Sequence, residues 1–350
     1  MLLFIVLAAM NTTCKHASEP LPENVSGTTS HLVLWRTDTI GYGGALKDIA
    51  IISQDNIWAV GEIYLKDSTG QIDRELYNVL QWDGTRWNPR RLYFYFGGVR
   101  YLRSCEAILA FGPNDVWLAC NAPSHWDGQS LNSVDVTDLV GTGQINAMWG
   151  KSSTDFYVAG NNGTFAHFDG QRFTTIATGV QSKFWDVSGV GEQIYIGSFN
   201  YDNQIYPSGI FSYSNSRFRY LFPDTVDHSS FTTLRNAFGL WLSPQGHLWV
   251  VGEGNVFQPL ISHTPLYSND YILKSIRGTA DNDVWAGGDR GSVLHYNGST
   301  WRKYSVAELG SGGVGYVLHN KIAVKGNTVA LVGWTMNPDY SILTLGKRMQ

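Results

Sequence analysis

Three histidines stand at one recurring position, each directly before an aromatic residue: His125, His167 and His295. Imidazole nitrogen is a common zinc ligand, so the chemistry that these residues suggest is metal binding. Copies of a repeat, however, lie in separate structural units, and a residue that recurs in each copy usually packs its own unit. We therefore expect a structural role for these histidines, and neither a metal ion nor another cofactor.

Three aspartates also share a repeat position, just before an apolar strand: Asp115, Asp155 and Asp283. The segment Asp281–Asp283 begins like a calcium-binding loop, but the glycine and the distal glutamate that an EF-hand requires are missing. Aspartate in a turn commonly accepts hydrogen bonds from nearby backbone amides. We expect these aspartates to do so, and not to bind calcium.

Motifs of catalysis are absent from the sequence. It contains no Gly-x-Ser-x-Gly, no phosphate-binding glycine loop and no His-Glu-x-x-His. A non-catalytic protein is therefore the leading prediction. The 29 carboxylates could still supply an acid and a base, so a carbohydrate-active hydrolase or lyase is the alternative. The net charge of -4 and the lack of a Lys/Arg cluster along the chain argue against a nucleic-acid partner.

The elements that position these residues are copies of one repeat, a hydrophobic residue followed by Trp or Tyr, two further residues and Gly. Clear copies lie at Trp58, Tyr157, Trp249 and Trp285, and the copy at Tyr195 has its glycine one residue earlier. Two weaker copies complete the set, because Cys120 replaces the glycine after Trp117, and Ala330 replaces the aromatic in the last one. A unit of about 40 residues is typical of a propeller blade or a solenoid turn.

Each copy predicts four antiparallel strands. Several copies end in a second hairpin with Asp-Gly or Asn-Gly at its turn, as in "WDGTRW" to Trp87 and "YNGSTW" to Trp301. Small sheets repeated radially form a β-propeller, in which every sheet is buried on both sides. The predicted fold is all-β, a seven-bladed β-propeller of four-stranded antiparallel blades over residues 31–350.

The two ends of this domain predict how the ring closes. The last copy ends with "YSILTLGKR", a third strand that lacks a fourth, and "HLVLWRTDTI" at 31–40 precedes the first blade. We expect Leu32–Thr39 to lie beside Ile342–Lys347. An N-terminal strand that completes the last blade would remove exposed sheet edges.

Residues 1–30 read as a leader and a flexible tether. Leu2–Met10 is an apolar run too short to span a bilayer but long enough for a signal peptide. Cys14 then resembles the lipid-modified cysteine of a bacterial lipoprotein, although Asn11–Thr13 fit a plain secretory leader as well. We expect export to the cell envelope or the medium, with membrane contact only through a lipid on Cys14.

The two other cysteines, Cys105 and Cys120, fall in the first two strands of the second blade. There they would face each other across a hairpin, so a disulfide is geometrically possible, and export would permit it. Two reduced, buried thiols remain an equal alternative, because a shift of one residue in register would separate them.

The copies that end at Phe173 and Trp301 resemble the repeats of secreted and lipoprotein β-propellers of bacteria, and more broadly photosystem assembly-factor propellers and the Asp-box propellers of sialidases. The Asp-box pattern is Ser-x-Asp-x-Gly-x-x-Trp, whereas Gly84 directly follows Asp83 here. No sialidase arginine triad or tyrosine nucleophile can be carried over. The resemblance therefore implies a fold and no activity.

Loop lengths give the best indication of function. The links between second and third strands and between blades hold the long inserts, and both kinds fall on one face of a propeller. We expect this monomer to bind a protein or a glycan through aromatic residues there: Tyr64, Tyr201, Tyr206, Phe222, Phe231, Tyr267, Trp334 and Tyr340. The alternatives are that these rings only pack the loops together, and that the chain is a purely structural envelope protein.

Overall fold

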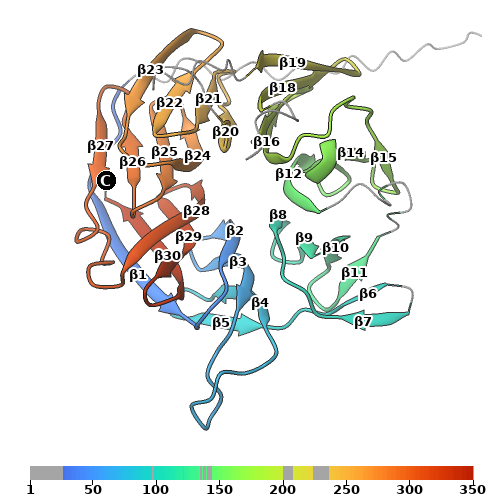
Figure 1. Ribbon diagram of the computed structural model, residues 1–350, viewed down its shortest axis with the longest axis vertical. Coiled ribbons are helices and arrows are strands. Elements are labelled where there is room, and N and C mark those ends of the chain that lie inside the picture. The colour runs from blue at the N-terminus through green and yellow to red at the C-terminus, as the bar shows by residue number, and fades with distance from the viewer. Residues whose placement is uncertain are drawn as a thin grey trace, which may run out of the picture.

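The computed structural model describes residues 27–96, 98–120, 122–134, 136, 139, 144–199, 208–223 and 236–349. These residues form seven four-stranded antiparallel sheets arranged as a ring (Figure 1). The all-β, seven-bladed propeller predicted from the repeats is confirmed. Among the described residues, no helix has the length and apolar character to cross a membrane.

Each blade runs from an innermost strand at the central channel to an outermost strand at the rim. Blade 1 consists of β2 (Leu46–Ser53), β3 (Asn56–Ile63), β4 (Tyr77–Trp82) and β5 (Trp87–Arg90). Blade 2 consists of β8 (Ala107–Gly112), β9 (Asp115–Cys120), β10 (Ala122–Trp126) and β11 (Leu131–Ser133). Blade 3 consists of β12 (Ile145–Ser152), β13 (Asp155–Gly160), β14 (Phe165–Phe168) and β15 (Phe173–Thr175), with a 3₁₀ turn, η2 (Asn161–Gly163), before β14.

The remaining blades repeat this order. Blade 4 consists of β16 (Phe184–Val190), β17 (Gln193–Ser198), β18 (Gly209–Ser214) and β19 (Arg217–Pro223). Blade 5 consists of β20 (Gly239–Leu242), β21 (Leu248–Val251), β22 (Asn255–Gln258) and β23 (Ser262–Ser268). Blade 6 consists of β24 (Leu273–Ala280), β25 (Asp283–Gly288), β26 (Val293–Tyr296) and β27 (Trp301–Tyr304). A separate hairpin, β6 (Phe94–Phe96) and β7 (Val99–Tyr101), lies between blades 1 and 2.

Blade 7 joins the two ends of the domain. Its strands are β28 (Tyr316–Lys325), β29 (Thr328–Met336), β30 (Tyr340–Arg348) and, outermost, β1 (Val33–Ile40). The pairing of β1 with β30 runs from Val33 opposite Arg348 to Ile40 opposite Ser341. The predicted closure of the ring by an N-terminal strand is therefore confirmed.

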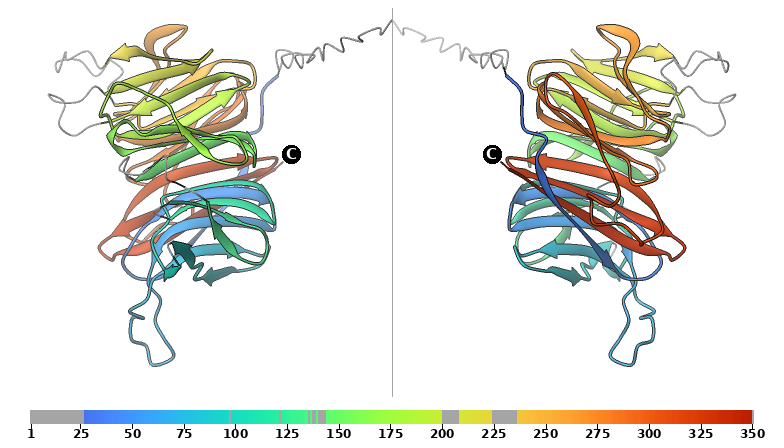
Figure 2. Two further views of the ribbon diagram at one scale, coloured as in Figure 1. Left: turned by 90° about the vertical axis from the view of Figure 1, so that its right-hand side faces the viewer. Right: turned by 90° about the vertical axis from the view of Figure 1, so that its left-hand side faces the viewer.

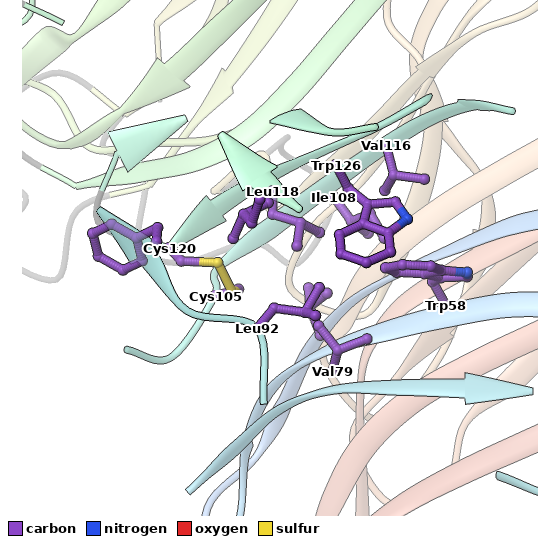
Figure 3. Close-up of a cluster of buried hydrophobic side chains, with 12 residues drawn as sticks. Trp58, Val79, Leu92, Cys105, Ile108, Val116, Leu118, Cys120 and Trp126 are labelled. Atoms are coloured by element: carbon purple, nitrogen blue, oxygen red, sulfur yellow. A yellow bond between two sulfur atoms is a disulfide. The ribbon is translucent and has the colours of Figure 1, made fainter. Parts of the chain in front are cut away.

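The hydrophobic core is divided among the interfaces between neighbouring blades, because each sheet is covered on both faces. The repeat aromatics anchor these interfaces, and Trp58 of blade 1 packs on Trp126 of blade 2 with ring centroids 6.0 Å apart. Figure 3 shows this pair and, in the same cluster, the disulfide that joins Cys105 to Cys120, with Cα atoms 3.9 Å apart.

The glycine of the repeat is required by close packing against the innermost strand. A Cβ on Gly160 would lie 2.2 Å from the carbonyl oxygen of Gln144, and one on Gly288 would lie 2.1 Å from that of Ile272. No side chain fits at such distances. Cys120 occupies the corresponding position of blade 2, where Cys105 lies opposite it and the disulfide fills the space.

The ring has two different faces. The tight-turn face carries the short links between first and second and between third and fourth strands, such as 54–55 and 83–86. The long-loop face carries the links between blades and the loops between second and third strands, such as 64–76 and 337–339. Figure 2 shows the loop 64–76 and the C-terminal end toward opposite faces of the ring.

Candidate functional site

The repeat histidines pair with the repeat aspartates inside single blades. Nε2 of His125 lies 2.8 Å from Oδ1 of Asp115, and Nε2 of His167 lies 2.7 Å from Oδ1 of Asp155. The corresponding atoms of His295 and Asp283 are 3.1 Å apart. Each pair ties the second strand of its blade to the third, which is a structural role. Among the described residues there is no group of three His, Cys, Asp or Glu residues that could hold a metal ion.

The partners of these aspartates differ from the prediction. In blade 2, Asp115 accepts hydrogen bonds from the side chains of His125 and Ser153, the latter at 2.5 Å, instead of from turn amides. The hydroxyl of Ser153 also accepts the indole N–H of Trp117 at 2.8 Å. The reason is that Asp115 is the first residue of β9, where His125 of the adjacent strand and Ser153 of the next blade lie within hydrogen-bond distance of its carboxylate.

A second recurring feature, which the sequence analysis missed, is a β-bulge near the start of the innermost strand. Pairing shifts by one residue at Lys47, Asn146, Trp185, Lys274 and Asn320. In the two other blades, the corresponding residues are Glu106 and Phe238, which directly precede their strands and donate backbone N–H bonds to Ala119 and Val251. A bulged residue lacks a cross-strand partner, and its side chain can be redirected.

These seven residues, one from each blade, form what we call the bulge ring: Lys47, Glu106, Asn146, Trp185, Phe238, Lys274 and Asn320. All of them line one cavity of about 370 Å³, together with Gln144, Lys183, Lys321 and Trp334. The cavity lies where the innermost strands begin, so it is the mouth of the channel on the long-loop face. We refer to it as the channel mouth.

Lysines dominate the charge of the channel mouth. Its lining holds four lysines and a single carboxylate, Glu106. Lys274 pairs with Asp289 at 2.8 Å, and the ammonium of Lys183 lies 4.0 Å from the ring centroid of Trp185. Burial lowers the pKa of Lys183. The carboxylate of Glu106 opposes this shift, and the positive charge of Lys47 adds to it.

Beneath the channel mouth, a buried ion cluster crosses the channel. Asp186 is 1% exposed and accepts two hydrogen bonds of 2.9 Å from Arg277, one of 3.0 Å from Lys321 and one of 3.1 Å from the amide of Leu240. Burial alone would raise the pKa of Asp186, but the two cations outweigh it and lower this pKa to about 2. The cluster links blades 4, 5, 6 and 7.

A second channel carboxylate, Asp48, is held differently. Its oxygens accept the amide N–H groups of Ile49 at 2.8 Å and of Ile108 in blade 2 at 3.0 Å. Burial raises the pKa of Asp48, although Lys321 opposes this shift. Asp48, Asp186 and Arg277 all line a further cavity of about 340 Å³, which continues the channel toward the tight-turn face.

Of the eight aromatic residues predicted for the binding face, Trp334 lines the channel mouth. Tyr64 donates its hydroxyl to Glu62 at 2.6 Å. The ring of Tyr340 packs edge-on against Tyr42, with centroids 5.3 Å apart, so it holds the start of β30 against the loop between β1 and β2.

The other predicted residues do not join this site. Tyr267 packs on Trp301 at 5.4 Å in the core between blades 5 and 6. Phe222 belongs to β19, but its side chain is outside the described residues, as are Tyr201, Tyr206, Phe231 and Cys14. The sequence does carry a signal for the bulge ring, because a polar residue interrupts the apolar strand at the same place in "LKDIA" and "LKSIR".

Comparisons with known proteins identify related folds. No family model and no curated protein sequence matches this chain. Among solved structures, YCF48 bound to D1 peptide is 14% identical, with a TM-score of 0.61, over 90% of this chain and 97% of that one.

Two further structures have the same ring. The extracellular domain of BT4673 from B. thetaiotaomicron is 13% identical, with a TM-score of 0.56, over 88% of this chain and 40% of that one. The WD40 propeller domain of Doa1 is 10% identical, with a TM-score of 0.57, over 90% and 96% of the two chains. At these identities the likeness shows the β-propeller fold alone.

Proposed function

We propose that this chain is a non-catalytic binding propeller whose partner docks on the long-loop face, with the channel mouth as the central site. The observation that carries the proposal is the bulge ring. Five of the seven blades depart from regular pairing at the same point, and the residues at this position in all seven blades line one cavity. Bulges are common where a sheet must aim a side chain at a site.

The likeness to other propellers supports a binding role. One structure of the same fold is YCF48 bound to a peptide, and another is an extracellular domain of BT4673. Propellers offer a rigid ring on which loops of one face can be varied for recognition. We favour a protein segment as the partner. A glycan is the alternative, and the experiment described below distinguishes the two.

Hydrolysis of a glycan is less well supported by the arrangement of carboxylates. Glycoside hydrolases need two carboxyl groups that flank the scissile bond. Glu106 is the single carboxylate that lines the channel mouth among the described residues. Deeper in the channel, Asp186 is bound by two cations, and both oxygens of Asp48 accept backbone amides. These carboxylates are engaged in holding blades together.

Export belongs to the same proposal, with Cys14 as the site of lipid attachment. The disulfide between Cys105 and Cys120 supports it, because such bonds persist in oxidising compartments outside the cytosol.

The experiment is a cross-linking capture from envelope extract with the full chain, followed by mass spectrometry. We expect a protein partner whose cross-links fall on lysines of the channel mouth and whose yield drops for Trp334→Ala. Tyr95→Ala is the matched control, since Tyr95 is a 56% exposed aromatic on the separate hairpin β6–β7. Equal capture by both variants would refute the proposed site. Release of sugars from glycans by the wild type would favour the hydrolase.

A further inference from the structure

The channel mouth gathers positive charge from four places that are distant in the sequence. Lys47, Lys274 and Lys321 come from the innermost strands of blades 1, 6 and 7, and Lys183 directly precedes that of blade 4. Like charges brought into a partly shielded cavity repel one another unless a counter-charge is present. The whole chain carries a net charge of -4, so this concentration of lysine is local.

Carboxylates of the described residues pair with two of these four lysines. Lys321 is paired with Asp186 at 3.0 Å and Lys274 with Asp289 at 2.8 Å. The side chain of Lys47 makes no hydrogen bond or ion pair with any residue that the structure describes. Burial lowers the pKa of Lys183, and the positive charge of Lys47 adds to this shift. Glu106 is the one carboxylate among the described residues that lines the same cavity as Lys47.

The lining also offers flat aromatic surfaces. Trp185 and Trp334 present aromatic rings to the same cavity as the lysines. Its volume of about 370 Å³ suits a small molecule or a terminal group of a larger one, within the usual range for ligand pockets.

We propose that the channel mouth binds an anionic group, a carboxylate or a phosphate, through Lys47 and its neighbouring lysines, with the body of the ligand against the tryptophans. This inference rests on the proposed function, because it specifies the chemistry that the same site recognises. Ammonium groups bind carboxylates and phosphates through charge-assisted hydrogen bonds, which are stronger in a shielded cavity than in water.

The test is equilibrium binding to the purified full chain at low ionic strength, measured by tryptophan fluorescence and by calorimetry. Citrate and glucuronate probe for a carboxylate, inorganic phosphate probes for a phosphate, and glucose is the uncharged comparison for glucuronate. We expect at least one anion to bind, glucose not to bind, and added salt to weaken the binding. The preferred anion identifies the chemical source.

Variants at Lys47 decide whether the site is the channel mouth. Lys47→Gln should weaken binding about tenfold, the loss of one charge-assisted hydrogen bond, and Lys47→Glu should weaken it further. This graded order cannot come from misfolding alone when both variants keep the wild-type melting temperature. Lys347→Gln is the matched control, because it removes the same charge from an exposed position of β30, toward the tight-turn face.

Two results would overturn the inference: no anion binding by the wild type below roughly 10 mM, or unchanged binding by both Lys47 variants. Either result leaves the proposed function standing if Trp334→Ala still abolishes capture of the partner. If anions bind as expected but the partner is captured elsewhere, the proposed function fails and the anion site remains.

Discussion

Replacing Asp186 by asparagine tests the buried ion cluster most directly. The substitution keeps the shape of the side chain but removes the negative charge that two cations share. Breaking a buried ion pair by removing one partner costs about 3 to 5 kcal/mol. We expect the lower end, about 3 kcal/mol, because the side chain of Arg277 is 27% exposed and channel water can partly solvate it.

The pKa of Asp186 gives an independent value of similar size. It falls from the ordinary 3.8 to about 2 in the folded protein, which corresponds to about 2 kcal/mol of stability from the charged form. Because the folded-state pKa is depressed, this contribution is complete above pH 3.8 and is lost as the pH falls through about 2. The difference between wild type and Asp186→Asn should shrink over the same interval.

The assay is urea unfolding, monitored by tryptophan fluorescence near neutral pH and again between pH 3.8 and about 2. Asp270→Asn is the control, since Asp270 is exposed and makes no hydrogen bond or ion pair with the described residues. If Asp186→Asn folds too poorly to measure, Asp186→Asn with Lys321→Gln should recover part of the lost stability. A free energy of unfolding within about 0.5 kcal/mol of the wild type, the ordinary range for surface substitutions, would refute the reasoning.

Three other predictions concern the repeat and the core. Gly160→Ala should lower the free energy of unfolding by about 1 to 3 kcal/mol, because its Cβ would overlap the carbonyl of Gln144. Gly112→Ala should not, because its Cβ would lie at an ordinary contact distance of 3.9 Å from Cβ of Asp115. Urea unfolding of both variants checks this. Reducing the Cys105–Cys120 disulfide, which spans 15 residues, should cost about 3 kcal/mol, measured as unfolding with and without reductant. Burial lowers the pKa of His319 from its ordinary value of 6.5 to about 4. The contribution of the neutral ring to stability is therefore complete above pH 6.5 and is lost as the pH falls toward 4. His319→Gln should flatten the profile of stability against pH over this range.

The repeat could be found in the sequence because its causes are local. The Asp-Gly and Asn-Gly turns require positive φ, and Gly84 and Gly298 do adopt it, with φ of 93° and 96°. The strand at 31–40 could be assigned to blade 7 because a ring with one incomplete blade leaves a single place for it. Both features depend on spacing and residue type, which can be read directly from the sequence.

The candidate site could be predicted only in part. Trp334 lines the channel mouth on the long-loop face. Tyr267 is likewise an aromatic residue in a long insert of the sequence, but it packs in the core between blades 5 and 6. A ring in a loop and a ring in a blade interface look alike in sequence, since both are amphipathic and both follow strands. Only their neighbours distinguish them.

The sequence by itself determined the number of blades, their strand order and the closure, because hydrophobic periodicity and turn chemistry act between residues that are close along the chain. The tertiary structure decided where charge gathers. Lys47 and Lys274 are far apart in a sequence without a basic cluster, yet the same bulge in two blades brings them to one cavity. The physical reason is that a bulge is set by backbone packing against the neighbouring strand and blade, and the electrostatic field of a site depends on distances through space.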